Sequence, residues 1–335
     1  MTQGGTGRIA VLGAGAWGTA LAIQAARAGH EVALWARDPA RAAALAATRE
    51  NASYLPGATL RPAIAPTADA ATALAGAALV LVVVPVQFLR PVLTDLRPAI
   101  EAGGAPLVVC SKGVERGTRL LPLEILEALF PGHPAAVLSG PNFAHEVAKG
   151  LPAAAVLASR DAALRRAAGE MLGTASFRIY GGDDPVGVQV GGAAKNVIAI
   201  AAGAVIGAGL GENARAALVT RGLAELSRLA VALGGRAETA AGLSGLGDLL
   251  LTTTGPGSRN TSLGHALGQG LSLAAALAGR AGVAEGVATA PALVARAAEA
   301  GVELPICAAV ADLLAGGLSV DAAMGRLLAR PRRDE

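Results

Sequence analysis

"RIAVLGAGAWGTALAIQAARAGH" (residues 8–30) joins a short apolar run, three spaced glycines and a longer alanine-rich segment. The run before the glycines has the β-branched, apolar character of a buried strand, and the segment after them predicts a helix. Gly13, Gly15 and Gly18 have the spacing G-x-G-x-x-G. The first glycine permits a tight turn, the second a close approach of the backbone to a pyrophosphate, and the third tight packing of helix on strand. This order predicts a dinucleotide-binding turn, with the pyrophosphate at the helix N-terminus.

The second predicted strand, EVALWAR at residues 31–37, bears on the choice of cofactor. An acidic residue at the end of this strand would bind the ribose hydroxyls of NAD(H), whereas an arginine suits the 2′-phosphate of NADP(H). Arg37 occupies the tip, and Asp38 is already expected to cap a helix that starts at Pro39. We therefore predict that NADP(H) is preferred, with NAD(H) still usable. Trp17, inside the glycine motif, either covers the cofactor or packs in the core, and both interpretations stay open.

The rest of the chain changes character near its middle. Further apolar runs predict strands at residues 78–85, 106–111, 135–140 and 153–159, and their near-continuous apolar character is typical of a parallel sheet covered on both faces. After about Val188 the pattern becomes long and helical. The predicted fold class is α/β, with an N-terminal Rossmann dinucleotide-binding domain at residues 1–187. An all-helical domain for substrate and catalysis follows at residues 188–335.

Composition limits the function classes. The 335 residues are 53% hydrophobic and 16% charged with a formal net charge of +3, which excludes a disordered chain and gives no reason to expect nucleic acid. The basic residues are scattered apart from a short tail, Arg330–Arg333. Neither the two cysteines nor the four histidines have metal-ligand spacing, so no metal is expected. The N-terminus lacks the features of a signal peptide, and we expect a cytoplasmic protein.

The stretch VGGAAKNVIAIAAG (residues 190–203) places Lys195 and Asn196 in an apolar helix. The surrounding run is about long enough to span a bilayer, but a lysine near its start argues against an integral membrane segment. An unpaired ammonium in an apolar interior costs several kcal/mol or loses its proton. We therefore expect Lys195 to face a cleft, where a neighbour such as Asp248 tunes it as a general acid/base for a carbonyl–alcohol conversion.

Other polar residues follow predicted strands or precede predicted helices. Lys112 and Asn142 come after strands, at the carboxyl ends where open α/β sheets bind ligands. The run 258–260, SRN, precedes a helical stretch and offers an anion site. Each has an ordinary alternative: a solvated lysine, a helix cap at Asp248, or a plain loop at 258–260.

Taken together, these motifs resemble the bacterial-type NAD(P)-dependent glycerol-3-phosphate dehydrogenase family. The resemblance runs over essentially the whole chain and rests on GAGAWGTALA, LVVVPVQ, CSKGVE, SGPNFAHEVAKGLPAA, GVQVGGAAKNVIAIAAG, NARAALVTRGLAE, GLSGLGDLLLT, SRN and VAEGVATA. It implies a helical C-terminal domain like that of 6-phosphogluconate dehydrogenase. It also implies reversible reduction of dihydroxyacetone phosphate to sn-glycerol 3-phosphate, which supplies phospholipid synthesis, and a homodimer.

The resemblance also implies roles for individual residues. Lys195 is the proton donor and acceptor, with Asp248 beside it, and Thr252 is a further polar candidate. The substrate would be bound by Lys112, Gly140, Asn142, Lys195, Asp248, Ser258, Arg259 and Asn260. The cofactor would be bound by Gly13, Gly15, Trp17, Gly18, Arg37, Lys112, Ala144, Arg259, Val283 and Glu285.

Three other readings of the sequence remain open at this point. A 6-phosphogluconate or ketopantoate type of reductase would share the architecture, although SRN with KNVIAIAAG and GLGDL is closer to the glycerol-phosphate family. A nucleotide-sensing protein would bind the cofactor without turnover. A purely structural or membrane protein is the third alternative.

Overall fold

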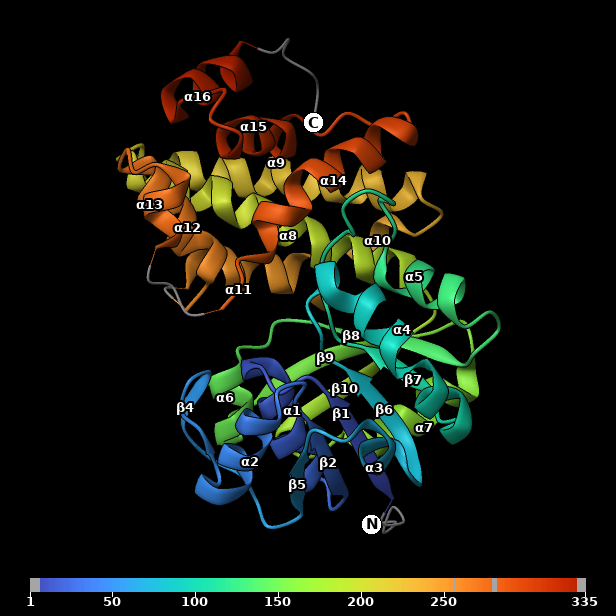
Figure 1. Ribbon diagram of the computed structural model, residues 1–335. Coiled ribbons are helices and arrows are strands. Elements are labelled where there is room, and N and C mark those ends of the chain that lie inside the picture. The colour runs from blue at the N-terminus through green and yellow to red at the C-terminus, as the bar shows by residue number, and fades with distance from the viewer. Residues whose placement is uncertain (1–6, 256, 279–281, 330–335) are drawn as a thin grey trace. The chain divides into compact units, whose positions relative to one another are not determined.

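The structure is a computed structural model that describes residues 7–255, 257–278 and 282–329. Internal contacts divide the chain into two units (Figure 1). Unit 1 comprises Met1–Lys112 and Leu121–Val188, and unit 2 comprises Gly113–Leu120 and Gln189–Glu335. The basic tail at 330–333 lies outside the described residues. The short segment 113–120 therefore packs with residues that are far away in the sequence.

Unit 1 contains an eight-stranded sheet in the order β10-β9-β8-β7-β6-β1-β2-β5. All neighbouring strands are parallel except β8 and β9, which run antiparallel. The strands are β1 Arg8–Leu12, β2 Glu31–Trp35, β5 Ile64–Thr67, β6 Ala77–Val82, β7 Leu107–Val109, β8 Ala135–Ser139, β9 Ala153–Ala158 and β10 Phe177–Gly182. A separate hairpin is formed by β3 Glu50–Asn51 and β4 Leu55–Thr59.

Helices cover both faces of this sheet (Figure 1). They are α1 Ala16–Arg27, α2 Pro39–Thr48, α3 Ala70–Leu74, α4 Val86–Gly103, α5 Pro122–Leu129, α6 Ala144–Lys149 and α7 Ala162–Leu172. On one face, Ile9 and Val11 form a core with apolar residues of α1, α2, α6 and α7. Helix α4 packs against both α3 and α5, and α3 also contacts β1, β2 and β6. Burial on both faces explains why the strand sequences are almost continuously apolar.

The predicted α/β architecture with a parallel sheet is confirmed, and two details differ. The strands β5 and β10 were not predicted, because IAPT contains a proline and FRIYGG ends in two glycines. The prediction that the strand at 153–159 continues a parallel sheet is wrong for its pairing with β8. Between β8 and β9 lies only the six-residue α6, which is too short to return the chain along the full length of a strand.

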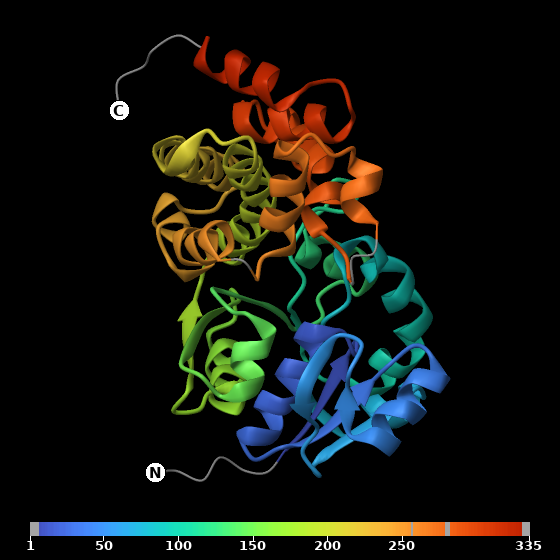
Figure 2. The same ribbon diagram turned by 90° about the vertical axis from the view of Figure 1, so that its left-hand side faces the viewer.

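From α8 onward, all the regular secondary structure in the described part of unit 2 is helical (Figure 2). Its α-helices are α8 Pro185–Gly207, α9 Gly211–Ala232, α10 Ala237–Ala240, α11 Asp248–Thr254, α12 Arg259–Gly268, α13 Leu273–Leu277, α14 Glu285–Glu299, α15 Pro305–Leu314 and α16 Val320–Leu328. A π-helix, Leu243–Gly247, leads directly into α11. The change from strands to helices after about residue 188 agrees with the sequence pattern.

Helix α8 is the core element of unit 2. It is long and apolar enough to cross a membrane, but 89% of its most apolar window is buried within the protein. Figure 1 shows it among α9, α12 and α14. The approach of α12 is very close: a Cβ on Gly203 would lie 2.0 Å from the carbonyl oxygen of Thr261, and a Cβ on Gly264 would lie 1.9 Å from that of Ile200. Glycine in both helices therefore permits their backbones to meet.

We expect Gly203→Ala to lower the free energy of unfolding by about 1–3 kcal/mol, since the new methyl group must push α12 away from α8. Gly325→Ala is the matched control: this glycine is exposed in α16, and a Cβ there meets no described atom within 4 Å. The control should gain stability by up to about 1 kcal/mol from helix propensity alone. Urea unfolding of both variants checks this, and equal stability of the two would contradict the packing described for α8 and α12.

Candidate active site

The glycine turn of unit 1 has the geometry that its sequence predicts. Gly13 has φ of 117° and donates its N–H to the Trp35 carbonyl at 3.0 Å. A Cβ on Gly18 would lie 1.8 Å from the Gly13 carbonyl oxygen, so only glycine fits there. Gly15 is the N-cap of α1, and a Cβ on it would meet no described atom within 4 Å. The open backbone at Gly15 and the free N–H groups of the helix start fit a phosphate group.

The other cofactor candidates of unit 1 lie around this turn or at the same edge of the sheet. Trp17 is partly buried and packs against the core, which supports the packing interpretation of its indole. Arg37 is exposed just beyond the end of β2. Ala144 is the first residue of α6, and α6 packs against α1. Arg37 is therefore available to an anionic ligand.

Lys112 and the loop after β8 lie together in unit 1. The Lys112 ammonium donates to the Gly140 carbonyl at 3.1 Å, and the Asn142 amide donates to the Ala154 carbonyl at 3.2 Å. Gly140 has φ of 151°, and a Cβ there would lie 2.9 Å from the carbonyl oxygen of Ala154. These contacts place the ammonium and the amide at one edge of the sheet, where β7 and β8 end.

Sequence reasoning missed one polar group beside that loop. The Ser139 hydroxyl, at the end of β8, is buried and has no hydrogen-bond partner among the described residues. The Asn142 Oδ1 atom is also buried and has no hydrogen-bond partner among those residues. Buried polar atoms are nearly always hydrogen-bonded, so two unsatisfied oxygens near Lys112 indicate a place where a ligand could donate. The serine is visible in SGPN, but no local pattern separates it from an ordinary turn residue.

In unit 2, Lys195 is buried and paired. Its ammonium lies 3.0 Å from Asp248 Oδ1 and donates to Thr252 Oγ1 at 2.8 Å. Asp248 is 1% exposed, Thr252 3% and Lys195 9%, so this lysine is not a surface side chain. The Thr252 hydroxyl donates in turn to the Asp248 carbonyl at 2.6 Å. A charged pair with so little exposure to solvent is held in one geometry, which suits a group that donates and accepts a proton in each turnover.

The local chain explains how the carboxylate reaches the lysine. Asp248, the first residue of α11, and Thr252 are i, i+4 neighbours and therefore lie on the same face of that helix. The π-helix immediately before α11 is a geometry that often occurs at functional sites. The helix-cap alternative for Asp248 does not describe its side chain, because Oδ1 pairs with Lys195.

The 258–260 segment forms the start of α12, and the side chains of Ser258 and Asn260 make hydrogen bonds within unit 2. Ser258 caps the helix, accepting from the Thr261 N–H at 3.2 Å. The Asn260 amide donates to Asn196 Oδ1 at 2.9 Å, and its Oδ1 accepts from the Gly286 N–H at 3.1 Å. Asn260 thus joins α8, α12 and the start of α14 and is buried.

Arg259 and Glu285 are the charged groups next to that network. Arg259 is exposed at the start of α12, whereas Glu285 is half-buried at the start of α14. Glu285 Oε2 is buried and has no hydrogen-bond partner in the part of the chain described. Burial raises the pKa of the Glu285 carboxyl to about 7, and the positive charge of Arg259 lowers it by less. Val283, just before α14, is 42% exposed.

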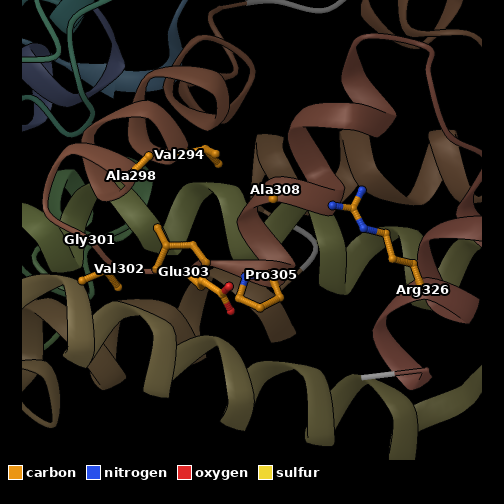
Figure 3. Close-up of a pocket in the computed structure, with 9 residues that line it drawn as sticks. Val294, Ala298, Gly301, Val302, Glu303, Pro305, Ala308 and Arg326 are labelled. Carbon is orange, nitrogen blue, oxygen red and sulfur yellow. The ribbon is translucent and has the colours of Figure 1, made fainter. Parts of the chain in front are cut away.

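A cavity of about 390 Å³ lies elsewhere in unit 2, along α14, α15 and α16 (Figure 3). Its lining is mostly apolar, with Glu303 and Arg326 as the charged members and none of the predicted site residues. Arg326 already pairs with Asp312 at 2.6 Å. Across the described residues, no group of three or more His, Cys, Asp or Glu side chains is placed to hold a metal ion.

A glycine turn of the dinucleotide-binding type on a mostly parallel sheet, together with a buried lysine–carboxylate pair in a helical unit, fits a nicotinamide-dependent oxidoreductase. Comparison with known proteins agrees. Residues 8–165 match the N-terminal part and residues 184–325 the C-terminal part of the family described as NAD-dependent glycerol-3-phosphate dehydrogenase. The chain belongs to this family.

Individual relatives cover nearly the whole chain. The glycerol-3-phosphate dehydrogenase [NAD(P)+] of Rhodospirillum rubrum is 57% identical over 98% of this chain and 93% of its own length. That of Caulobacter vibrioides is 56% identical and covers 98% of both chains. The crystal structure of glycerol-3-phosphate dehydrogenase from Coxiella burnetii, 38% identical, covers 97% of this chain and 99% of its own, with a TM-score of 0.93. The chain is thus an NAD(P)-dependent oxidoreductase.

Glu285 gives a pH-dependent stability. The folded protein keeps a proton on this carboxyl up to about pH 7, whereas the unfolded chain releases it near the ordinary value of 4.5. The protonated Glu285 carboxyl therefore contributes fully to the free energy of unfolding below pH 4.5, and this contribution is lost as the pH rises to about 7. We expect Glu285→Gln to lose less stability than the wild type between about pH 5 and about pH 8.

Urea unfolding without cofactor at those two values of pH measures the difference. The exposed Glu238 of α10 provides the control, since Glu238→Gln should follow the wild-type pH dependence. Identical pH dependence of the wild type and Glu285→Gln would show that burial does not raise the pKa of the Glu285 carboxyl.

Proposed function

We propose that the chain catalyses the reversible reduction of dihydroxyacetone phosphate to sn-glycerol 3-phosphate with NADPH. The observation that carries the proposal is the buried Lys195–Asp248–Thr252 cluster in a chain of this family. Residues 1–187 would form the cofactor-binding domain and residues 188–335 the domain for substrate and catalysis. Spectrophotometry tests the proposal directly, because NADPH absorbance should fall only when dihydroxyacetone phosphate is present.

The proton step belongs to Lys195. NADPH, when bound, supplies a hydride to the ketone carbon, which leaves negative charge on the carbonyl oxygen. The Lys195 ammonium gives that oxygen a proton and becomes a neutral amine, which is reprotonated before the next turnover. Asp248 stabilises the ammonium form, and Thr252 Oγ1 accepts a further hydrogen bond from Nζ that helps to fix its position. In the reverse direction the neutral amine accepts the hydroxyl proton.

Binding of the phosphate would orient the ketone. The start of α12 offers backbone N–H groups and the exposed guanidinium of Arg259, both suited to a phosphate dianion. Ser258 and Asn260 hold this helix start in place through their own hydrogen bonds. Lys112, with Gly140 and Asn142, would add positive charge and hydrogen-bonding groups for the substrate. Contacts remote from the reacting carbon supply energy for orientation.

The cofactor would be bound by the glycine turn, with Trp17, Arg37, Lys112 and Ala144 in unit 1. Arg259, Val283 and Glu285 are the candidates in unit 2. The exposed Arg37 at the end of β2 supports a preference for NADP(H) over NAD(H). We further infer a cytoplasmic homodimer that supplies glycerol 3-phosphate for phospholipid synthesis, as the family resemblance implies.

Removal of the lysine tests the proton step. Lys195→Ala should lower kcat for dihydroxyacetone phosphate reduction by about 10²–10⁴-fold, because the substitution removes the proposed proton donor. Circular dichroism should show the helical content unchanged. Lys149→Ala, which alters an exposed lysine of α6, is the control and should keep wild-type turnover. Near wild-type kcat in Lys195→Ala would reject this role.

The alternatives are separated by the same assay. A ketopantoate type of reductase would oxidise NADPH with ketopantoate in place of dihydroxyacetone phosphate. A nucleotide sensor would bind NADPH, visible as a change in its fluorescence, and oxidise it with neither ketone.

Arg37→Ala tests the cofactor preference. Loss of a charge-assisted hydrogen bond to the 2′-phosphate should lower kcat/KM for NADPH by about tenfold or more and leave kcat/KM for NADH nearly unchanged. Arg166→Ala, at an exposed position of α7, should change neither value. Equal KM values for NADPH and NADH in the wild type would contradict the preference itself.

A further inference from the structure

A buried amide from outside the glycine motif holds the backbone of that motif. Asn51, in β3, lies 37 positions from Ala14 and is 2% exposed. Its Nδ2 donates to the Ala14 carbonyl at 2.9 Å and to Thr19 Oγ1 at 2.7 Å. Both hydrogens of the amide nitrogen are therefore used, one on each side of the point where the turn enters α1.

An arginine completes the contact. The Arg41 guanidinium, from α2, also donates to the Ala14 carbonyl and lies 3.4 Å from Asn51 Oδ1. The ring of Tyr54 stacks under it, with the guanidinium carbon 3.9 Å from the ring centroid. Two donors from two different elements thus meet one carbonyl oxygen of the glycine turn. We name Asn51 and Arg41 the carbonyl clamp.

The clamp has a consequence for the opposite side of the same peptide. The bond between Ala14 and Gly15 is planar, so in a trans peptide the Gly15 N–H points away from the Ala14 carbonyl. Fixing the carbonyl toward Asn51 and Arg41 fixes this N–H on the other side, at the N-cap of α1. A phosphate approaching Gly15 would meet an N–H that is already oriented and pays no cost for ordering it.

We propose that Asn51 and Arg41 are positioning residues that orient the Gly15 N–H for the cofactor pyrophosphate. The proposal rests on the proposed function only in its use of a dinucleotide cofactor. It assigns no contact between the clamp and the 2′-phosphate, in contrast to Arg37. Loss of the clamp should therefore weaken every ligand that carries the pyrophosphate, by the same factor.

Binding titrations without substrate test the proposal, with NADPH, NADH and ADP-ribose as the probes. Asn51→Ala should raise the Kd of all three by about tenfold or more and to a similar extent. Arg41→Ala should act in the same direction, and Arg41→Lys, which retains a donor, should recover part of the loss. AMP, which lacks the pyrophosphate, should lose less. Hydrogen exchange of a peptide spanning the turn should become faster in Asn51→Ala.

Three outcomes would overturn the proposal. The first is unchanged Kd values in folded Asn51→Ala or, if that variant does not fold, in Arg41→Ala. The second is a loss confined to NADPH, which would make the clamp a direct reader of the 2′-phosphate. The third is an equal loss for AMP, which would indicate general damage to the unit. Because no turnover is measured, failure to reduce dihydroxyacetone phosphate would reject the proposed function and leave these results intact.

Discussion

The buried ion pair between Lys195 and Asp248 is the constraint on which unit 2 depends. An ammonium in a helix as apolar as α8 is costly, and removing one partner of a buried pair typically costs about 3–5 kcal/mol. The Asp248 carboxylate at 3.0 Å and the Thr252 hydroxyl at 2.8 Å offset the cost of burying the ammonium. They also require α11 to begin beside α8, which the preceding π-helix allows. The same contacts that offset the cost of burying the lysine hold its ammonium in one position, as the proposed role in proton transfer requires.

Glycines allow the backbone segments of both units to approach one another closely. In unit 1 they leave the backbone open at the start of α1 and let that helix lie close to the turn before it. In unit 2 they let α8 and α12 touch, which brings the start of α12 to the Asn196–Asn260 contact. In both units, glycines thus permit the close backbone approaches that place the polar side chains. An Ala/Gly-rich composition with few aromatic residues is consistent with a protein built on such close backbone contacts.

The sequence predicted what depends on local pattern and missed what depends on distance along the chain. The glycine turn and the cap of α2 by Asp38, which accepts from the Ala40 N–H at 3.0 Å, follow from neighbouring residues. The apolar surroundings of Lys195 indicated a paired lysine, and the structure places Asp248 beside it. The contact of Asn51 with the Ala14 carbonyl could not be predicted, because no local sequence pattern links two residues 37 positions apart. Likewise, the antiparallel pairing of β9 depends on the length of α6 and not on the strand's own residues.

Transfer of a labelled hydride tests the central claim, that the chain reduces a ketone by adding a hydride to carbon and a proton to oxygen. The protein is incubated with dihydroxyacetone phosphate and NADPH carrying deuterium at both positions of nicotinamide C4, and the product is analysed by mass spectrometry. The account predicts sn-glycerol 3-phosphate with one deuterium on C2 and none on oxygen after exchange with water. Absence of this product, or its formation without deuterium on C2, would contradict it.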